Sequence, residues 1–375
     1  MILYQLMITA LLLFLFGFTW KNLKDFKQPS LRPPEEKTKK PRVSICIPAR
    51  NEEKNIRTLV RSLINQTYSN IEILVLDDHS SDHTALMVEE LALEDARVRC
   101  IPGKELYPGW VGKTFALQQL GQLARGEWLL FCDADTKFTP VCVETVLSEA
   151  AAENLDALSL FPLQITQTWG EKWLVPMIYF ILTSYLPLNK VRNNPNPALS
   201  AGCGQFFFVK KNVFMEVGGF KEIKATLHDG SKFPQLLKKK GKEYDLFDGQ
   251  KLVSCRMYTN FKSTWQGLSR SFYSAINFPL FALSLLWHSA LFVAPLFFFT
   301  VGITSQKPFL TWLFLPFIQL VTAISLRQMQ NRHFHFPTKS AWFTPFSFAL
   351  FATLQIHSFL RHTLFKSVTW KGRKI

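Results

Sequence analysis

The sequence predicts an α/β fold with a doubly wound, mostly parallel sheet, between an N-terminal membrane anchor and a C-terminal helical membrane region. Two observations predict this organisation. Between residues 43 and 150, short apolar runs alternate with stretches whose apolar residues recur at helical spacing, an order typical of parallel sheets. Outside that region, uncharged apolar stretches reach the length that a helix needs to cross a bilayer.

Four strands and three helices are expected in the first of these regions. The short apolar runs predict strands at residues 43–47, 71–76, 97–101 and 127–132. The amphipathic stretches predict helices at residues 53–65, 81–94 and 113–124. The carboxyl ends of parallel strands share one edge of the sheet, and ligands of such sheets bind there. Functional residues are therefore expected just after the strands.

The apolar stretches predict a multi-pass protein of the cell membrane. Residues 1–20 are expected to form an uncleaved anchor with its N-terminus outside, because lysines follow the apolar stretch instead of preceding it. Residues 21–42 form a polar linker to a cytosolic domain at 43–275, in which the short apolar segment 173–188 is expected to be interfacial. Membrane helices are expected within 276–360, at 276–303, 308–326 and 341–360, and a basic tail at 361–375.

The basic tail leaves two topologies open. Three late spans would place the tail outside, against the preference of Lys and Arg for the cytosolic side. Two late spans plus one re-entrant or interfacial segment would keep it in the cytosol. The hydropathy of the sequence does not choose between them.

Most of the net charge of +15 comes from the back of the chain. All 28 acidic residues lie at or before Asp248, whereas 13 Lys and Arg residues follow it among long apolar runs. A nucleic-acid-binding protein would more typically spread its charge over one folded face. We therefore expect an anionic membrane surface, and not nucleic acid, as a partner. The six cysteines form no C-x-x-C pair and are expected to be buried, reduced thiols.

Polar motifs follow the predicted strands. Their sequences are Pro48-Ala49-Arg50-Asn51-Glu52, Asp77-Asp78-His79-Ser80-Ser81-Asp82 and Asp133-Ala134-Asp135, and a nearby loop supplies Gly112-Lys113. Carboxylates are the oxygen ligands that Mg²⁺ and Mn²⁺ take together with substrate phosphates. A single Asp-x-Asp is weak evidence, since turns and helix caps use Asp freely, and Asp82 can be such a cap. His79 and His83 have a metal-pair spacing, but a hydrated loop is the simpler interpretation.

These motifs resemble family 2 glycosyltransferases, which have the nucleotide-sugar-binding GT-A fold. The resemblance covers residues 42–150 and continues through Ala201-Gly202-Cys203-Gly204-Gln205 and Gly218-Gly219-Phe220 to about residue 275. The anchor, the Pro-Gly-Trp-x-Gly-Lys loop at 108–113 and the closing Trp370-Lys371-Gly372-Arg373 look most like a lipid-modifying group. That group includes diaponeurosporenoate (carotenoid) and hopanoid-associated glycosyltransferases and, more distantly, ceramide glucosyltransferases.

The resemblance implies a role for each matching residue. Pro48, Ala49 and Glu52 would face the nucleotide, Asp77 and Asp78 would bind its uracil and ribose, and Lys113 its diphosphate. Asp133 and Asp135 would be the D-x-D motif that binds a divalent cation (Mg or Mn), with Asp135 preferred as the metal ligand. Asp229 occupies the position of the catalytic base, although His228 replaces the preceding carboxylate of the family pattern. Arg270 would steady the diphosphate, but the Q/R-x-x-R-W motif of processive members is absent from residues 265–272.

The expected activity is therefore transfer of a sugar from a nucleotide sugar, with UDP-glucose preferred, to a membrane lipid. Inverting, in-line displacement is expected, with a carotenoid or other terpenoid as the first acceptor class and a glycerolipid or sphingoid-like lipid as the second. Two alternatives remain: a processive polysaccharide synthase, and a non-enzymatic membrane protein with a nucleotide-binding or scaffold domain.

Overall fold

The computed structural model describes residues 1–30, 40–273, 277–364, 369–370 and 373–374 of the 375-residue chain. The chain divides into two compact units. The α/β unit comprises Phe26–Gln164 and Leu188–Arg256, and the helical unit comprises Met1–Asp25, Ile165–Pro187 and Met257–Ile375. The helical unit is therefore assembled from three separate parts of the chain.

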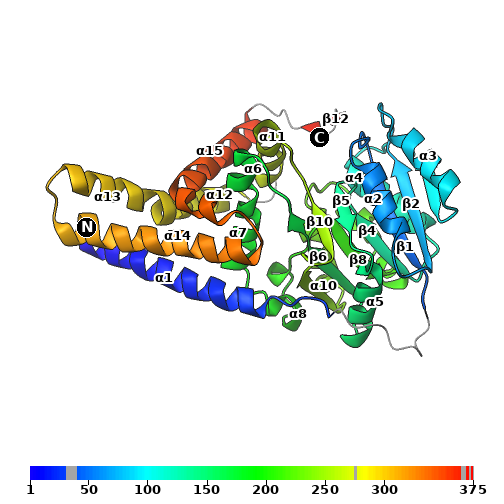
Figure 1. Ribbon diagram of the computed structural model, residues 1–375, viewed down its shortest axis with the longest axis horizontal. Coiled ribbons are helices and arrows are strands. Elements are labelled where there is room, and N and C mark those ends of the chain that lie inside the picture. Colours follow the sequence, from blue (N-terminus) through cyan, green and yellow to red (C-terminus); the bar gives the residue numbers. More distant parts are fainter. Residues whose placement is uncertain (31–39, 274–276, 365–368, 371–372, 375) are drawn as a thin grey trace. The chain divides into compact units, whose positions relative to one another are not determined.

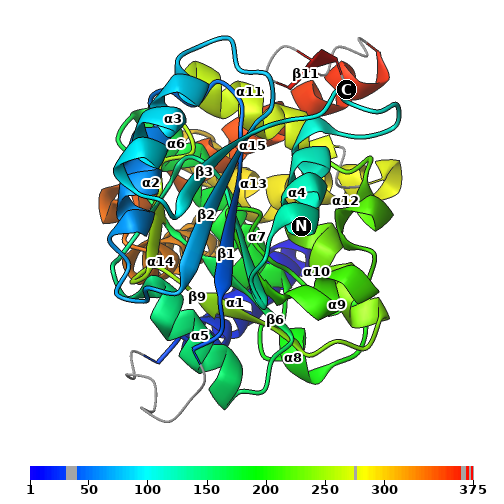
Figure 2. The same cartoon turned by 90° about the vertical axis from the view of Figure 1, so that its right-hand side faces the viewer.

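A seven-stranded sheet forms the centre of the α/β unit, with strand order β3-β2-β1-β4-β8-β6-β9 (Figure 2). Its strands are β1 (Val43–Ala49), β2 (Ile71–Asp77), β3 (Val98–Pro102), β4 (Trp128–Cys132), β6 (Ala157–Phe161), β8 (Phe206–Lys210) and β9 (Tyr244–Asp248). Neighbouring strands are parallel except at β8, which runs antiparallel to both β4 and β6. The mostly parallel, doubly wound sheet predicted from the sequence is confirmed.

Helices cover both faces of this sheet. One face is covered by α2 (Ile56–Ile64), α3 (Thr84–Glu94) and α5 (Cys142–Ala152), and the other by α4 (Gly112–Leu123), α9 (Lys211–Glu216) and α10 (Asp229–Lys239). The short helices α8 (Lys190–Asn193), η1 (Pro197–Leu199) and η2 (Gly219–Ile223) lie in connections. The predicted helices before the fourth strand are present, although α2 begins at Ile56 and α3 at Thr84, a few residues later than expected.

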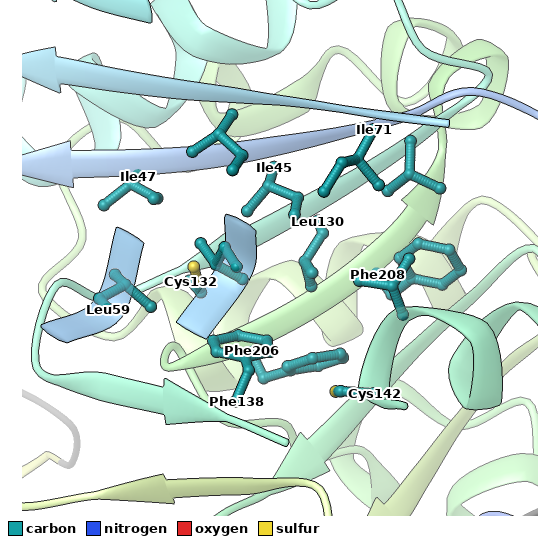
Figure 3. Close-up of a cluster of buried hydrophobic side chains, with 14 of the residues drawn as sticks. Ile45, Ile47, Leu59, Ile71, Leu130, Cys132, Phe138, Cys142, Phe206 and Phe208 are labelled. Atoms are coloured by element: carbon teal, nitrogen blue, oxygen red, sulfur yellow. The ribbon is translucent and has the colours of Figure 1, made fainter. Parts of the chain in front are cut away.

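Alternate residues of the strands form the two halves of the core. On the α2 side, Ile45, Ile47, Leu130 and Phe208 lie in one buried cluster (Figure 3). On the α4 side, the Phe131 ring packs against Phe214 and Phe220. Because both faces are buried, the strands read as continuous apolar runs in the sequence, as is typical of parallel sheets.

A second, three-stranded sheet has the order β5-β10-β7, with β5 at Thr136–Phe138, β7 at Leu163–Gln164 and β10 at Val253–Cys255. Its central strand pairs Cys255 with Thr136 on one side and with Gln164 on the other. The sheet therefore brings Cys255 beside the residues that directly follow the Asp133-Ala134-Asp135 motif.

The described part of the helical unit contains eight helices and three short helical turns. The helices are α1 (Ile2–Asp25), α6 (Trp169–Leu174), α7 (Pro176–Tyr185), α11 (Phe261–Phe272), α12 (Phe278–His288), α13 (Ala294–Thr304), α14 (Leu315–His333) and α15 (Thr344–Thr363). The turns are η4 (Ser289–Val293), η5 (Leu310–Phe314) and η6 (Thr338–Phe343), and β11 (Thr369–Trp370) pairs antiparallel with β12 (Arg373–Lys374). Figure 1 shows α1, α13 and α14 side by side, with α12 and α15 at an angle to them.

Four helical stretches are long and apolar enough to cross a membrane: Ile2–Asp25, Phe278–Thr304, Leu310–His333 and Thr338–Thr363. The segment 173–188, expected to be interfacial, falls largely on α7, whose 10 residues are too few to span a bilayer. Polar side chains join it to the longer helices. Gln330 of α14 donates to Thr183 and Ser184 at 2.7 and 3.1 Å, and Thr19 of α1 donates to Ser184 at 3.0 Å.

Candidate active site

Three of the four predicted motifs lie at one edge of the large sheet. Because β1 pairs in parallel with both β2 and β4, the carboxyl ends of these three strands are adjacent. Ala49 at the end of β1 is the register partner of Asp77 at the end of β2. Pro48 also belongs to β1 and Asp133 follows β4 directly. The edge therefore presents the residues that were expected to face a ligand.

The loops after β1 and β2 are joined to each other by hydrogen bonds. The Asn51 carboxamide accepts from the backbone N–H of Ser81 at 2.8 Å, and the Asn51 N–H donates to Ser80 Oγ at 2.9 Å. Asn51 and His79 both adopt left-handed backbone conformations, with φ of 54° and 59°. Such conformations are strained outside glycine and are held in place by surrounding contacts, often at functional sites.

Further hydrogen bonds hold the backbone of the acidic residues in these two loops. The Asp78 N–H donates to the Ala49 carbonyl at 2.8 Å, and the Asp78 carbonyl accepts from Arg50 at 2.5 Å. The Glu52 N–H donates to Thr84 Oγ1 at 2.8 Å. Asp77 accepts a hydrogen bond from the Ser80 N–H through Oδ2, while its buried Oδ1 has no partner among the described residues.

Lys113 joins two carboxylates that are far apart in the sequence. Its Nζ lies 2.7 Å from Asp133 Oδ1 and 3.0 Å from Asp229 Oδ2. It also donates to the Gly204 carbonyl at 3.4 Å. Lys113 stands in the first turn of α4 and Asp229 is the first residue of α10. The position of the expected base is thus brought beside the first aspartate of the D-x-D motif.

Burial and charge shift the pKa values of this group in opposite senses. The pKa of Asp133 is raised to about 7, because burial, together with the negative charges of Asp135 and Asp229, outweighs the lowering effect of Lys113. The pKa of Lys113 lies well above its ordinary value because its two carboxylate neighbours outweigh the burial that disfavours the ammonium. The lysine is therefore a fixed positive charge between two acids.

Asp135 has the features of a cation ligand. Its Oδ1 is buried and has no hydrogen-bond partner in the described part of the chain. Burial and the nearby negative charge of Glu52 raise the pKa of its carboxyl. A divalent cation would neutralise this accumulation of charge, so the residues present fit such an ion. Among the described residues no group of three or more His, Cys, Asp or Glu side chains forms a complete metal site, and substrate phosphates would supply the remaining ligands.

Three neighbours of these acids were not singled out as site residues from the sequence. A Cβ on Gly204 would lie 2.7 Å from Asp229 Oδ2, so the absence of a side chain there makes room for the carboxylate. Cys255 donates a hydrogen bond to Asp135, and Gln205 donates to Cys255 Sγ at 2.9 Å. Gly204 and Gln205 belong to the family-like Ala-Gly-Cys-Gly-Gln run, but no sequence pattern points to Cys255.

Arg270 lies in α11 of the helical unit and not in the α/β unit. Burial lowers its pKa, and so does the positive charge of Arg361 on α15, while Tyr258 acts in the opposite sense. His79 and His83 do not converge on one site. His79 contacts Asp78 and Glu105, whereas His83 contacts Glu53.

Comparison with known proteins identifies the family to which part of the chain is similar. Residues 44–218 match the model of glycosyl transferase family 2. The chain is 25% identical over 236 residues to 4,4'-diaponeurosporenoate glycosyltransferase of Staphylococcus haemolyticus, a match that covers 61% of this chain and 60% of the relative. It is 38% identical over 99 residues to beta-monoglucosyldiacylglycerol synthase of Trichormus variabilis, covering 26% of this chain and 21% of the relative. The matches thus span less than two thirds of either relative.

A solved structure shares the fold over nearly the whole chain. The mannosyltransferase from Pyrobaculum calidifontis, in complex with GDP-Man and Mn²⁺, aligns with a TM-score of 0.52 and 15% identity, covering 97% of this chain and 100% of the neighbour. At that identity the likeness shows the fold alone. Because the matched residues 44–218 include the ends of β1, β2 and β4 with their motifs, the chain carries over those residues a domain of glycosyl transferase family 2, and its fold is the GT-A fold.

Proposed function

We propose that this enzyme transfers a sugar from a nucleotide sugar to a membrane lipid, with Asp229 as the base. The observation that carries the proposal is the bridge formed by Lys113 between Asp133 and Asp229. A transferase of this kind must hold the base for the acceptor close to the carboxylates beside the donor diphosphate. In the bridge, Asp133 and Asp229 both contact the same ammonium group, so the two carboxylates lie close together.

Each group then has a stated task. Asp229 accepts the proton of the acceptor hydroxyl, whose oxygen attacks the anomeric carbon as the bond from that carbon to the diphosphate oxygen breaks. One such in-line displacement inverts the anomeric centre. Asp135 and Asp133 would hold a divalent cation, whose chemistry is to stabilise the negative charge that develops on the leaving diphosphate. Glu52, Asp77 and Asp78, at the ends of β1 and β2, would orient the nucleotide.

The acceptor class follows from the helical unit. Its long helices expose large apolar side chains, including Phe14, Leu283, Phe297 and Phe317. Such surfaces are typical of contact with lipid. One relative is named as a glycosyltransferase of 4,4'-diaponeurosporenoate and another as a synthase of a glucosyldiacylglycerol. We propose UDP-glucose as the donor, a carotenoid or other terpenoid as the first acceptor to test, and a glycerolipid as the second.

Packing within the helical unit supports the topology with two late spans. α6 starts shortly after β7, and α11 starts shortly after the last residue of the α/β unit, so both lie on the side of the membrane where that unit lies. Phe343, just before α15, stacks on Trp173 of α6, and Arg361 near the end of α15 donates to Ser269 of α11 at 3.3 Å.

Both ends of α15 therefore contact elements on one side of the membrane. We propose that α15 lies along the interface and that α1, α12–α13 and α14 are the spans, which keeps the basic tail in the cytosol. In intact cells, a membrane-impermeant thiol reagent should label a Gln306→Cys variant, in the loop between two spans, but not a Lys374→Cys variant. Labelling of both without permeabilisation would restore three late spans.

The activity itself is tested with purified protein, UDP- and GDP-linked sugars, and total membrane lipid. We expect transfer in Mn²⁺ or Mg²⁺, and none in excess EDTA.

Asp229→Asn should reduce turnover about 10²–10⁴-fold, the usual effect of losing a general base, while UDP affinity changes little. Glu222→Gln is the matched control, because Glu222 is exposed on a neighbouring turn. Polymeric product would favour a synthase, and no turnover of any sugar nucleotide would favour a non-enzymatic role.

A further inference from the structure

We propose that a hydrogen-bonded relay ending in Cys255 orients the carboxylate of Asp135 for its cation. The proposal rests on the proposed function for the identity of that cation. The members of the relay are Gln164, Gln205, Cys255 and Asp135, all in the α/β unit. They come from four different elements or their ends, so the relay exists only in the folded sheet.

The geometry of the relay is set by the three-stranded sheet. Cys255 is the register partner of Thr136, the residue after Asp135, and also of Gln164. Gln205 immediately precedes β8 and bridges the two strands. Its Nε2 lies 2.9 Å from Cys255 Sγ, and its Oε1 accepts from Gln164 Nε2 at 2.7 Å. Gln164, Gln205 and Cys255 are all at least nine-tenths buried, so water does not compete for these bonds.

All donors of the relay point the same way. Gln205 Oε1 is occupied by Gln164 and by the thiol of Cys203 at 3.6 Å, which leaves the Gln205 amide N–H groups for the sulfur of Cys255. In the side-chain hydrogen bond between Cys255 and Asp135 the thiol supplies the proton, because an ionised carboxylate can only accept. The thiol is thus oriented by Gln205 just as a second partner orients the ligand of a metal.

As a consequence, one oxygen of the Asp135 carboxylate accepts from the thiol of Cys255, and the other is available for a cation. The thiol contact constrains the rotation of the Asp135 carboxyl group, while Oδ1 remains buried without a partner among the described residues. Losing an outer partner of this kind typically lowers metal affinity about 10–100-fold. We therefore expect Cys255 to act as a positioning residue, not a catalytic one.

The first experiment needs neither metal nor nucleotide. The infrared S–H stretching band of Cys255 is isolated as the difference between the wild-type protein and Cys255→Ser. Asp135→Asn and Gln205→Leu should each shift this band, because each removes one of the two hydrogen bonds of the thiol. A band that stays in place in both variants would overturn the relay.

The second experiment measures Mn²⁺ binding by electron paramagnetic resonance, with Mn²⁺ alone and with UDP or GDP. Cys255→Ala should weaken Mn²⁺ binding about 10–100-fold in the presence of nucleotide, and Cys255→Ser, which keeps a donor, should lose less. The matched control is Cys142→Ala, which opens a comparable buried space within the core and away from the acids. It should lower the melting temperature without changing Mn²⁺ affinity.

The two failures can be distinguished. Wild-type affinity in Cys255→Ala would overturn the relay while leaving the proposed function intact. Absence of Mn²⁺ and nucleotide binding in the wild-type protein would overturn the proposed function and the metal role of the relay together, whatever the infrared band shows.

Discussion

Lys113 Nζ lies 3.0 Å from the carboxylate of Asp229, although 116 residues separate them in the chain. The same ammonium contacts Asp133 at 2.7 Å. In this structure, therefore, the lysine expected to bind the donor diphosphate is paired with the first aspartate of the D-x-D motif and with the aspartate in the position of the base. A donor diphosphate bound here would compete with both carboxylates for it.

Removing this charge should affect both stability and turnover. Lys113→Met leaves two mostly buried carboxylates without their cation, and an unsatisfied buried polar group costs about 1–3 kcal/mol, or more when it is charged. We expect a lower melting temperature and transfer reduced at least about 10²-fold. Lys113→Arg keeps the charge and should retain more of both. Thermal unfolding and initial rates check this, and a fully active Lys113→Met would contradict it.

The raised pKa of Asp133 predicts a pH-dependent stability of the free protein. Since its pKa is about 7 in the folded state and about 3.9 when unfolded, the folded protein binds the proton more tightly between these values. Its contribution to stability is present below about pH 4 and is lost as pH rises toward 7, by roughly 3 kcal/mol. Asp133→Asn should flatten the melting temperature over this range. If the melting temperatures of the wild-type protein and Asp133→Asn change with pH in parallel, Asp133 does not have the raised pKa.

Gly204→Ala should impair the base selectively. A Cβ at this position would lie 2.7 Å from Asp229 Oδ2 and 3.0 Å from Oδ1, so the carboxylate must move. Displacement by a fraction of an ångström to one ångström can cost about 10²-fold in rate. We expect turnover to fall while UDP affinity, measured by calorimetry, stays near that of the wild-type protein. Equal losses of affinity and turnover would indicate general unfolding of the edge.

Lys238 should stabilise the loop that precedes β8. Although it lies in a run of three lysines, it is only 8% exposed, and its ammonium donates to the carbonyls of Lys190, Asn194 and Leu199 at 3.3, 2.8 and 2.8 Å. Lys238→Met should destabilise the protein by about 1–3 kcal/mol and increase amide exchange at 190–199. Lys239→Met changes an exposed neighbour and should have little effect on either measurement.

The sheet and its edge could be predicted because their determinants are local. Strands β1, β2 and β4 are mostly apolar runs, and the D-x-D motif directly follows β4. The pairing of Lys113 with Asp229 could not be predicted from spacing, because it depends on how α4 and α10 cover the same face. Cys255 could not be singled out from the sequence, because β10 has only three residues and shows no periodic pattern of apolar residues. The number of late spans could not be predicted, because hydropathy reports the length of an apolar helix and not its direction.

The division of the helical unit among three parts of the chain has a consequence for its synthesis. Ile165–Pro187 is made long before α14, yet Thr183 and Ser184 are hydrogen-bonded to Gln330, and the Pro176 carbonyl accepts from Arg327 at 3.1 Å. At about 5–20 residues per second, the ribosome needs roughly ten seconds or more to supply those partners. The hydrogen bonds that join α7 to α14 can therefore form only after α14 has been made, so this part of the helical unit is completed late in synthesis.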